Sequence, residues 1–370
     1  MPLLDYNMYL QSINEPPVKY VHESYIRDGR LFTRLPIDTI PTQKRVDKRF
    51  LGEAQDPTWL NIGQEPPVPW SAGLHNYEEG LAYIGDNIDF PIQLAKDPNY
   101  IGGKTMPQMQ LDLYLHMIGF SIDNYLINNS KVTPSGPGVG DPKGFYGIAY
   151  RLKNPSVFGN NPGCSIQASF SLATADRSAT NGINFTQDMR QLMMHMGSDT
   201  GSGIFATCAP QVLWLGDSAI KAAGTTGGFD ISKDMFGRTI RKFDDLDIVS
   251  CGLLKPQGAQ FLQTSPIIDC AQDINGLSDG DPGYNPIGAV YSTMYFIRVA
   301  KGKSADNDIE DPTTGVSMWQ QYDQKIMKFD QLPGQRTGRY MIDTSTGLWN
   351  PGTFDLGRIY GIKTNGPSGN

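Results

Sequence analysis

The clearest periodic stretch of the chain runs from Thr105 to about Asn128. Thr105 fits the N-cap of a helix, Pro107 suits its first turn, and Gln108 completes a capping box with Thr105. Apolar side chains then recur at the spacing of one helical face: Leu111, Leu115, Ile118, Ile122 and Tyr125. Three more widen that face: Leu113, Met117 and Phe120. The pattern predicts a long helix that is covered on more than one side.

A second helical pattern follows Thr186, in the segment QDMRQLMMHM. Thr186 fits its N-cap, Gly197 fits its stop, and four apolar side chains share one face: Met189, Leu192, Met193 and Met196. The short apolar run from Val212 to Leu215 is then predicted as a buried strand. Asp217 is predicted to cap a short helix that ends at Gly224.

Strand-like sequence patterns dominate the rest of the chain. Its short β-branched and aromatic runs are bounded by Gly, Asp and Asn. They lie at 145–152, 239–243, 246–251, 289–303, 315–323, 324–330 and 357–364. Helical and strand patterns mix without a regular βαβ alternation, and no fixed internal repeat is present. The sequence therefore predicts an α+β fold.

The N-terminal hundred residues lack the periodicity of a closed core. Residues 1–45 are of mixed charge and broken by Pro, which indicates an extended arm that lies on something else. Residues 51–100 hold short apolar runs separated by Pro, Gly and Asn, which favours a long two-stranded excursion. The whole chain of 370 residues is long enough for two domain-sized units.

Composition and charge exclude several classes of protein. The 41 Gly and 26 Pro residues have no period, so they indicate turns and arms, not a collagen-like repeat. A formal net charge of −7 argues against a protein that wraps nucleic acid through a basic surface. The 4 Cys lack a CxxC pair, so zinc is unsupported and free thiols are expected. No secretory leader and no stretch of membrane-spanning length are found.

Few residues suggest chemistry. Asp112 and His116 lie one helical turn apart, with Asp123 farther along, so a metal site or an acid–base pair is conceivable, although a polar seam is the preferred interpretation. His195 is predicted to be a half-buried filler. The acidic stretch 273–281 departs from a calcium loop at Leu277 and lacks the closing Glu, so a plain turn is expected. The stretch 306–311 is predicted to be a solvated loop. No catalytic, cofactor-binding or metal-binding residue is nominated.

Cations gather in two strand-like segments. Arg238, Arg241 and Lys242 lie in one, and Arg336 and Arg339 lie in another. Nucleic acid is one candidate partner, but the acidic surface of a neighbouring subunit explains these cations as well. The subunit interpretation is preferred because the chain as a whole is acidic.

The order of these parts resembles that of the major capsid proteins of tailed bacteriophages, whose fold is named after the phage Hong Kong 97. The resemblance rests on the long helix closing at LINN (126–129), followed by GFYGIAYRL and PQVLWLGDSAIKAAG. It continues with FDISKDMFGRTIRKFDDLDIVSC (229–251), MYFIRVAKGK, TTGVSMWQ and the closing RTGRYMIDTSTGLWNPGTFDLGRIYGIKT. The match is one of pattern over most of the chain.

The resemblance implies a division of the chain. Residues 1–45 would be an extended N-terminal arm and 46–103 the hairpin called the E-loop. Residues 104–184 and 336–370 would form the peripheral (P) domain around a long spine helix, and 185–335 the axial (A) domain. Residues 1–50 contain no heptad repeat of the kind found in a helical scaffolding segment. We therefore expect a separate scaffolding protein or none, and no cleavage of a large segment.

The resemblance also implies a function. Such proteins self-assemble as hexamers and pentamers into an icosahedral shell that encloses double-stranded DNA, so the chain is expected in a virion assembled in the host bacterial cytoplasm. Portal and decoration proteins would be further partners, and the DNA would be contacted weakly. Aromatic and cationic side chains are the interface candidates: Trp59, Trp70, Tyr83, Arg238, Arg241 and Lys242. The alternatives are an encapsulin-type nanocompartment and a metal-dependent hydrolase built on Asp112 and His116.

Overall fold

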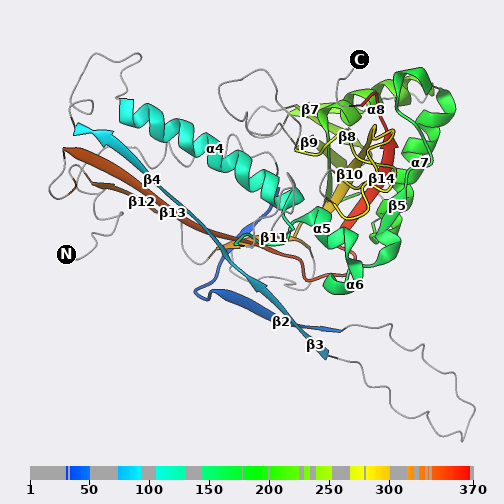
Figure 1. Cartoon of the computed structure of the whole chain (residues 1–370). Helices are drawn as coiled ribbons and strands as arrows, with labels where there is room; N and C mark the ends of the chain where they lie inside the picture. Colours follow the sequence, from blue (N-terminus) through cyan, green and yellow to red (C-terminus); the bar gives the residue numbers. More distant parts are fainter. Residues whose placement is uncertain are drawn as a thin grey trace, which may run out of the picture.

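The computed structural model describes most of the chain beyond residue 30. The described residues are 31, 34–50, 74–92, 106–130, 143–176, 178–198, 201–224, 229–233, 239–251, 267–278, 281–300, 315–320, 325–329, 332 and 336–366. They form a seven-stranded sheet with its helices, a second sheet beside one long helix, and a separate hairpin (Figure 1). This mixture of helices with parallel and antiparallel strands confirms the α+β class.

The seven-stranded sheet is the centre of the lobe at the right of Figure 1. β10 (Tyr291–Arg298) runs antiparallel to β14 (Leu356–Lys363) on one side and to β6 (Ile204–Cys208) on the other. The order across the sheet continues outward through β5 (Ser165–Gln167) next to β14, and through β9 (Leu246–Ser250), β8 (Thr239–Phe243) and β7 (Asp230–Lys233) beyond β6. All five residues of β6 are buried, as its apolar text requires.

Two helices pack on this sheet and on each other. α7 (Ala179–His195) lies against β14, where a side chain at Gly357 would meet Met196 and Leu192. α8 (Pro210–Ala222) contacts α7 where Gly182 lets the helices approach so closely that a Cβ atom there would overlap the backbone of Ala219. The buried face of α7 includes the predicted apolar side chains: Met189, Leu192 and Met193.

The second sheet is an elongated ribbon built around β13 (Thr337–Trp349). β4 (Ala82–Pro91) pairs with β13 along ten residues, from Thr337↔Pro91 to Thr346↔Ala82, and β12 (Lys325–Phe329) pairs with the same strand. β11 (Ser317–Gln320) joins the far end of β13, and β1 (Ile37–Thr39) adds to β11 in parallel. α4 (Met106–Asn128) runs beside this ribbon and is the long helix that the sequence predicts (Figure 1).

A two-stranded hairpin projects away from both sheets. β2 (Lys44–Phe50) pairs antiparallel with β3 (Leu74–Gly80), and the pair extends beyond the rest of the described chain (Figure 1). The predicted two-stranded excursion is therefore present at its root. Short elements complete the fold: α5 (Ile148–Lys153), α6 (Pro155–Phe158), η3 (Pro162–Cys164) and η4 (Thr174–Asp176).

Three predicted elements are wrong. Residues 148–153 form helix α5, not a strand, because Ile148, Ala149 and Leu152 are buried at helical spacing. Val212 and Leu215 lie inside α8, which Pro210 opens. Consequently Asp217 does not cap a helix but forms an ion pair with Lys221 one turn later, at 2.8 Å.

The start of α7 and the placement of the arm also differ from the sequence predictions. α7 begins at Ala179 with Ser178 as its cap, because the Ser178 hydroxyl accepts the backbone N–H of Asn181, so Thr186 lies within the helix. Gly197 does follow the helix, with a φ of 72° that favours glycine. The arm does not lie wholly on something else: Leu31 and Leu35 are buried in the core of their own chain.

The predicted domain division does not coincide with the sheets. The seven-stranded sheet draws β5 and β14 from the ranges predicted as peripheral and β6 to β10 from the range predicted as axial. β13 and β14, both within 336–370, belong to different sheets. The division therefore stays a prediction based on the resemblance. Among the described helices, none has the length and apolarity needed to cross a membrane.

Candidate subunit interface

The structure separates the predicted interface residues into two places. Tyr83 is on β4 in the ribbon, and Arg241 and Lys242 are on β8 in the seven-stranded sheet. Trp59, Trp70 and Arg238 lie outside the described residues. The candidates therefore do not form one site, and each place has its own surroundings.

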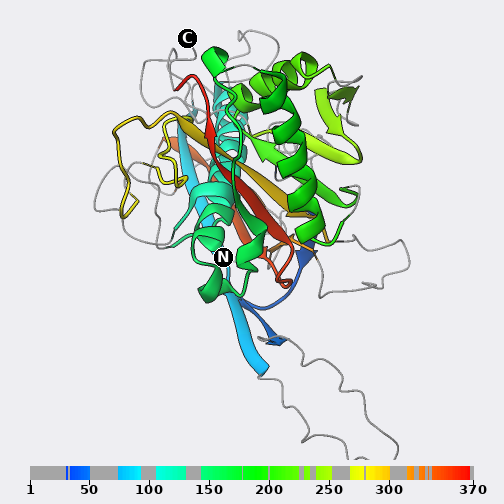
Figure 2. The same ribbon diagram turned by 90° about the vertical axis from the view of Figure 1, so that its right-hand side faces the viewer.

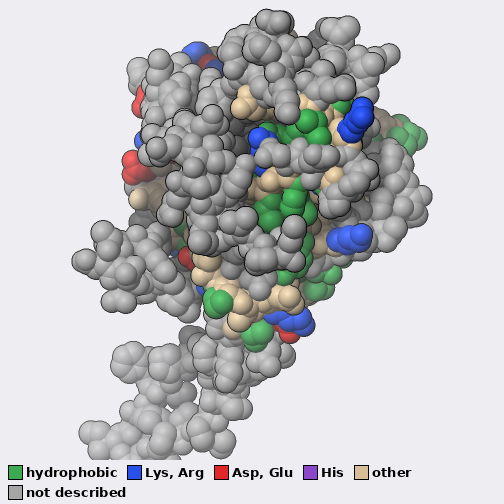
Figure 3. Space-filling view, turned by 90° about the vertical axis from the view of Figure 1, so that its left-hand side faces the viewer, with side chains coloured by type: hydrophobic (Ala, Val, Ile, Leu, Met, Phe, Trp, Pro, Cys, Tyr) green, Lys and Arg blue, Asp and Glu red, His purple; other side chains and the backbone are tan. Residues whose placement is uncertain are grey.

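Tyr83 is partly exposed at the end of the ribbon where β4 begins. Its side chain is 48% exposed, and it lies opposite Ser345 of β13. A space-filling view from the left-hand side of Figure 1 shows hydrophobic side chains in a central band with Lys and Arg beside it (Figure 3). Apolar groups bordered by cations are typical of surfaces that meet other proteins.

The two described cations of β8 have partners in their own chain. The Arg241 guanidinium donates from Nη1 to the backbone oxygen of Leu213 at 3.0 Å. Lys242 Nζ lies 3.5 Å from Asp247 Oδ1. Lys242 nevertheless keeps 44% of its side chain exposed, so it can also be reached by a second molecule.

The other predicted cation pair lies at one end of β13. Arg339 holds Asp89 of β4 through two contacts, Nε to Oδ1 at 2.5 Å and Nη2 to Oδ2 at 2.8 Å. The hydrogen bond from Arg339 lowers the pKa of Asp89 and raises that of Arg339. Arg336, three residues earlier in the chain, is exposed. This exposed pair joins the two longest strands of the ribbon.

A buried ion pair fixes the root of the hairpin. Arg151 on α5 is 0% exposed and donates to Glu79 Oε1 on β3, which is 3% exposed, at 2.5 Å. Its other nitrogens donate to the backbone oxygens of Tyr146 at 2.9 Å and Leu348 at 3.5 Å. A charge so deeply buried needs partners on every side. Arg151 therefore ties the hairpin to α5 and to the ribbon.

A second contact supports the same root. Arg45 on β2 lies 3.2 Å from Asp38 Oδ2, and its guanidinium carbon is 4.4 Å from the ring centre of the buried Trp349. The sequence analysis did not identify Arg151, Glu79 or Arg45. An Arg inside the apolar run FYGIAYRL was the one available signal, because such a charge must be paired if the run is buried.

The end of the arm is attached to α4 and to β9. The backbone N–H of Leu31 donates to Asp123 Oδ2 on α4 at 3.4 Å, and Asp123 is buried. Arg34 Nη1 forms an ion pair with Asp247 Oδ2 on β9 at 2.9 Å. Asp123 thus helps to hold the arm. The side chains of Asp112 and His116 lie outside the described part of the chain, so the alternative built on them stays untested.

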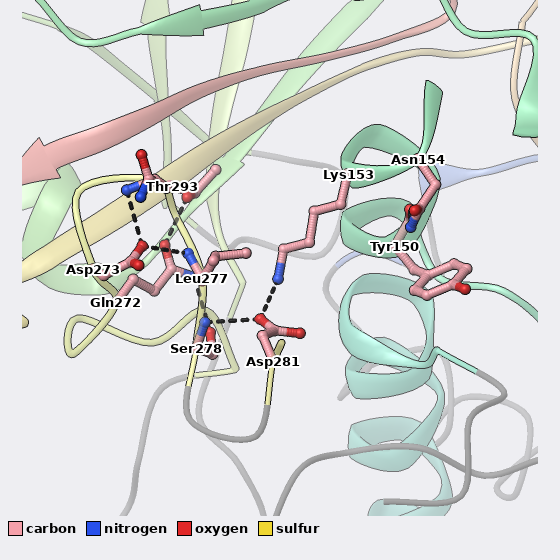
Figure 4. Close-up of polar contacts among 10 residues, drawn as sticks. Tyr150, Lys153, Asn154, Gln272, Asp273, Leu277, Ser278, Asp281 and Thr293 are labelled. Carbon is pink, nitrogen blue, oxygen red and sulfur yellow. Dashed lines mark hydrogen bonds and ion pairs between the residues drawn. The ribbon is translucent and has the colours of Figure 1, made fainter. Parts of the chain in front are cut away.

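The acidic stretch before β10 is a turn that stabilises itself. Asp273 Oδ1 accepts the backbone N–H groups of Asn275 and Leu277, both at 2.9 Å, as the sequence predicts for a plain turn. Asp281 accepts the N–H of Ser278 and forms an ion pair with Lys153 on α5 (Figure 4). Burial lowers the pKa of Lys153, and the charge of Asp281 opposes that effect.

His195 and the cysteines differ in their surroundings. The prediction of a half-buried His195 is wrong: its ring is exposed at the end of α7, and Nδ1 lies 2.8 Å from the backbone oxygen of Gly163. All 4 cysteines are buried free thiols. Burial raises the pKa of Cys251 to about 12 and that of Cys270 to about 11, so they are protonated at neutral pH. The described residues contain no group of three or more His, Cys, Asp or Glu side chains that could hold a metal ion.

Comparison with known proteins finds likenesses in structure but none in sequence. No protein-family model and no curated protein sequence matches the chain. In structure, it is similar to the SrpI encapsulin from Synechococcus elongatus, with a TM-score of 0.53, 12% identity, and coverage of 98% of this chain and 97% of that one. The capsid of Myoviridae phage XM1 matches with a TM-score of 0.52 and 10% identity over 90% of this chain and 92% of that one.

A third likeness is to the capsid of an empty GTA particle, with a TM-score of 0.50 and 7% identity over 90% of this chain and 89% of that one. These likenesses define the class: the chain has the Hong Kong 97-type fold of shell proteins, as the resemblance in sequence implies. Phage capsids, GTA capsids and an encapsulin share the fold, and at these identities the likeness establishes the fold alone.

Proposed function

We propose that this chain is a major capsid protein of a tailed phage. Its activity is self-assembly, as hexamers and pentamers, into an icosahedral shell that encloses double-stranded DNA. The observation that carries the proposal is the likeness to the XM1 phage capsid across 90% of this chain, with a TM-score of 0.52. The likeness spans nine-tenths of the chain and is not confined to one of its sheets. A structural role without catalysis follows from the proposal.

The hairpin supports a role in assembly. A two-stranded ribbon that extends away from the body buries little of its own surface, and a lone hairpin is marginally stable in water. Its root is nevertheless fixed by the buried Arg151–Glu79 pair and by Arg45 against Trp349. A rigid root with a projecting ribbon suits an element that reaches a neighbouring subunit.

The charge of the chain fits a container for DNA. A net charge of −7 keeps the inner wall from holding the genome through many Lys and Arg contacts, so DNA would be touched weakly and without sequence preference. A separate scaffolding protein, a portal and a decoration protein belong to the proposal as partners, with assembly in the host bacterial cytoplasm. The arm, E-loop, P-domain and A-domain ranges remain part of it.

The second candidate is an encapsulin-type nanocompartment. The SrpI encapsulin has a TM-score of 0.53 and covers 98% of this chain, so this likeness favours a shell that holds a protein cargo. Both candidates predict closed particles and differ in their contents. Double-stranded DNA in particles produced together with the neighbouring genes would support the capsid, whereas a protein cargo would support the nanocompartment.

The experiment that tests the proposal is assembly of the purified chain. Negative-stain electron microscopy and light scattering should detect closed particles, or hexamers and pentamers, after expression alone or with a scaffolding protein. An Arg151→Met variant, whose hairpin root is loosened, should assemble less. A chain that stays a compact monomer under all these conditions, with its first hundred residues resistant to protease, would contradict the proposal.

A further inference from the structure

Helix α5 joins parts of the chain that are far apart in the sequence. Its start is fixed on the end of α4, because the Gly147 N–H donates to the backbone oxygen of Asn129 at 2.7 Å. A Cβ atom at Gly147 would lie 2.7 Å from the backbone oxygen of Tyr125, so the contact leaves no room for a side chain. The start of α5 is therefore held in place, while its last turn carries two cations, Arg151 and Lys153.

These two cations bind different segments of the chain. They are two residues apart, which separates their side chains by roughly 200° around the helix. Arg151 is 0% exposed and binds Glu79 of β3 at the root of the hairpin. Lys153 binds Asp281 in the loop before β10, and their side chains are 18% and 30% exposed (Figure 4). The last turn of α5 thus connects the hairpin to this loop.

The loop before β10 is described over residues 267–278 and 281–287 and is called here the β10 loop. Asp281 helps to order it, since the same carboxylate accepts the backbone N–H of Ser278 at 2.8 Å. At its start, the Asn128 side chain of α4 donates to the backbone oxygen of Ile267 at 2.7 Å. Figure 2 shows the β10 loop in yellow on one side of the sheet and helices α7 and α8 on the other. The contact between α7 and α8 is therefore separated from the β10 loop by the sheet.

The two links made by α5 differ in strength. Separation of the buried Arg151–Glu79 pair leaves charges away from water, which is strongly unfavourable. The Lys153–Asp281 pair is partly exposed, so water and salt can replace each partner at a small cost in free energy. When the hairpin root is displaced, α5 should therefore stay bound to β3, and the pair with Asp281 should separate first.

We propose that α5 couples the hairpin to the β10 loop, so that displacement of the hairpin root moves the last turn of α5 and releases Asp281 from Lys153. The contact at Gly147 is the fixed point of this movement. The coupling is a property of the single subunit and acts in both directions, because linkage between two sites is reciprocal. In a shell, a neighbouring subunit that displaces the hairpin would thereby alter the β10 loop, a consequence that rests on the proposed function.

Acetylation of lysine amines tests the coupling in the unassembled subunit. Glu79→Gln keeps the size of the side chain and removes its charge from the hairpin root. It should speed the acetylation of Lys153 roughly fivefold or more. Peptide mass spectrometry measures this rate against the exposed Lys221. Glu78→Gln is the matched control, because Glu78 is the preceding residue, is 48% exposed and pairs with Lys44, so its substitution should leave the rate at Lys153 unchanged.

A second control separates the coupling from a general loss of stability. Gly182→Ala disturbs the contact between α7 and α8 and should not speed the acetylation of Lys153 under native conditions. Equal rates at Lys153 in Glu79→Gln and Glu78→Gln would overturn the inference. Equal rates in Glu79→Gln and Gly182→Ala would overturn it as well. Neither result bears on the proposed function, because the measurements need no assembly.

A substitution in the β10 loop tests the opposite direction. Asp281→Asn removes the charge that binds Lys153 but keeps an oxygen for the Ser278 N–H. It should speed hydrogen exchange of the β2–β3 backbone N–H groups roughly threefold. Asp244→Asn, which removes an exposed ion pair with Arg190, is the control, since Asn also tolerates the φ of 53° at this position. Hairpin exchange that is equal in the two variants would refute the coupling.

Discussion

The seven-stranded lobe and the long ribbon differ in how completely their side chains are buried. In the lobe, β6 is buried at all five positions and β10 at its six central positions, because helices and loops of the same chain cover both faces. In the ribbon, β4 alternates: Ala82 and Phe90 are buried, while Tyr83 and Asp89 are exposed. The lobe completes its core within one chain, whereas β4 of the ribbon leaves alternate side chains exposed or partly exposed.

Because of this difference, we expect substitutions in the two regions to affect the stability of the subunit unequally. Changes in the lobe should lower the stability of the single subunit, and changes at exposed positions of the ribbon should leave it largely unaltered. The joints between the two regions should matter most, because they contain charges removed from water.

The largest effect is expected at the joint formed by Arg151 and Glu79. Arg151→Met leaves Glu79 as a buried charge without its main partner, which should lower the free energy of unfolding by ~3–5 kcal/mol. Urea denaturation of the unassembled subunit measures this change. The double variant Arg151→Met with Glu79→Leu removes both charges and should recover much of the loss. A single variant as stable as the double one would contradict this account of the joint.

The next effect distinguishes two glycines, one in the lobe and one in the hairpin. At Gly182 of α7, a Cβ atom would overlap the backbone of Ala219 on α8, so Gly182→Ala should push the two helices apart. We expect a loss of ~1–3 kcal/mol in the free energy of unfolding. At Gly80 of β3 a Cβ atom would meet nothing within 4 Å. Gly80→Ala is therefore the control and should change the free energy of unfolding by less than ~0.5 kcal/mol.

A smaller effect is expected where the arm joins both regions. Arg34→Ala removes the ion pair between Arg34 and Asp247, whose side chains are 17% and 27% exposed respectively. The substitution should lower the free energy of unfolding by ~1 kcal/mol. The loss should appear locally, as faster hydrogen exchange of the Met318 N–H that donates to the Pro36 oxygen at 2.9 Å. Arg34→Lys keeps the charge and should retain part of the protection. Unchanged exchange in Arg34→Ala would indicate that the strand pairing alone holds the arm.

The smallest effect is expected on the exposed face of the ribbon, at Arg339 and Asp89. The hydrogen bond from Arg339 lowers the pKa of Asp89, and Arg339→Gln should return it to its ordinary value near 3.8, as carbon-detected NMR titration would show. The pKa of Asp89 is lower in the folded than in the unfolded protein, so the ion pair stabilises the fold fully above the unfolded pKa, near pH 4. This stabilisation is lost as the pH falls through the folded pKa of Asp89. High salt should weaken the pair, and a pKa of Asp89 unaffected by the substitution would refute the assignment.

Much of the fold could be predicted from periodicity. The α4 helix, the late strands and the root of the hairpin each repeat one pattern long enough to identify the element. Short apolar runs failed instead: GIAYRL and PQVLWL fit a strand or a buried helix equally well, and only the packing around Ile148 and Val212 makes them helical. The start of α7 was missed because Asn181, Gly182 and Asn184 conceal the helix in the sequence.

The candidate site was less predictable than the fold. Aromatic and cationic residues can be selected as interface candidates by type alone, but the sequence does not say which of them already have partners. Arg241 donates to its own chain, while Trp214, not selected from the sequence, is exposed. Ion pairs and hydrogen bonds often join residues far apart in the sequence, such as Arg151 and Glu79.

The sequence by itself determined the α+β class, the long helix, the free thiols and an acidic chain with the pattern of a shell protein. These follow from local spacing and from summed charge, which need no knowledge of distant contacts. The tertiary structure decided which charges are buried in pairs and how the arm and hairpin are attached. Those features arise from contacts between distant segments, and the free energy of such contacts is fixed only when the chain has folded.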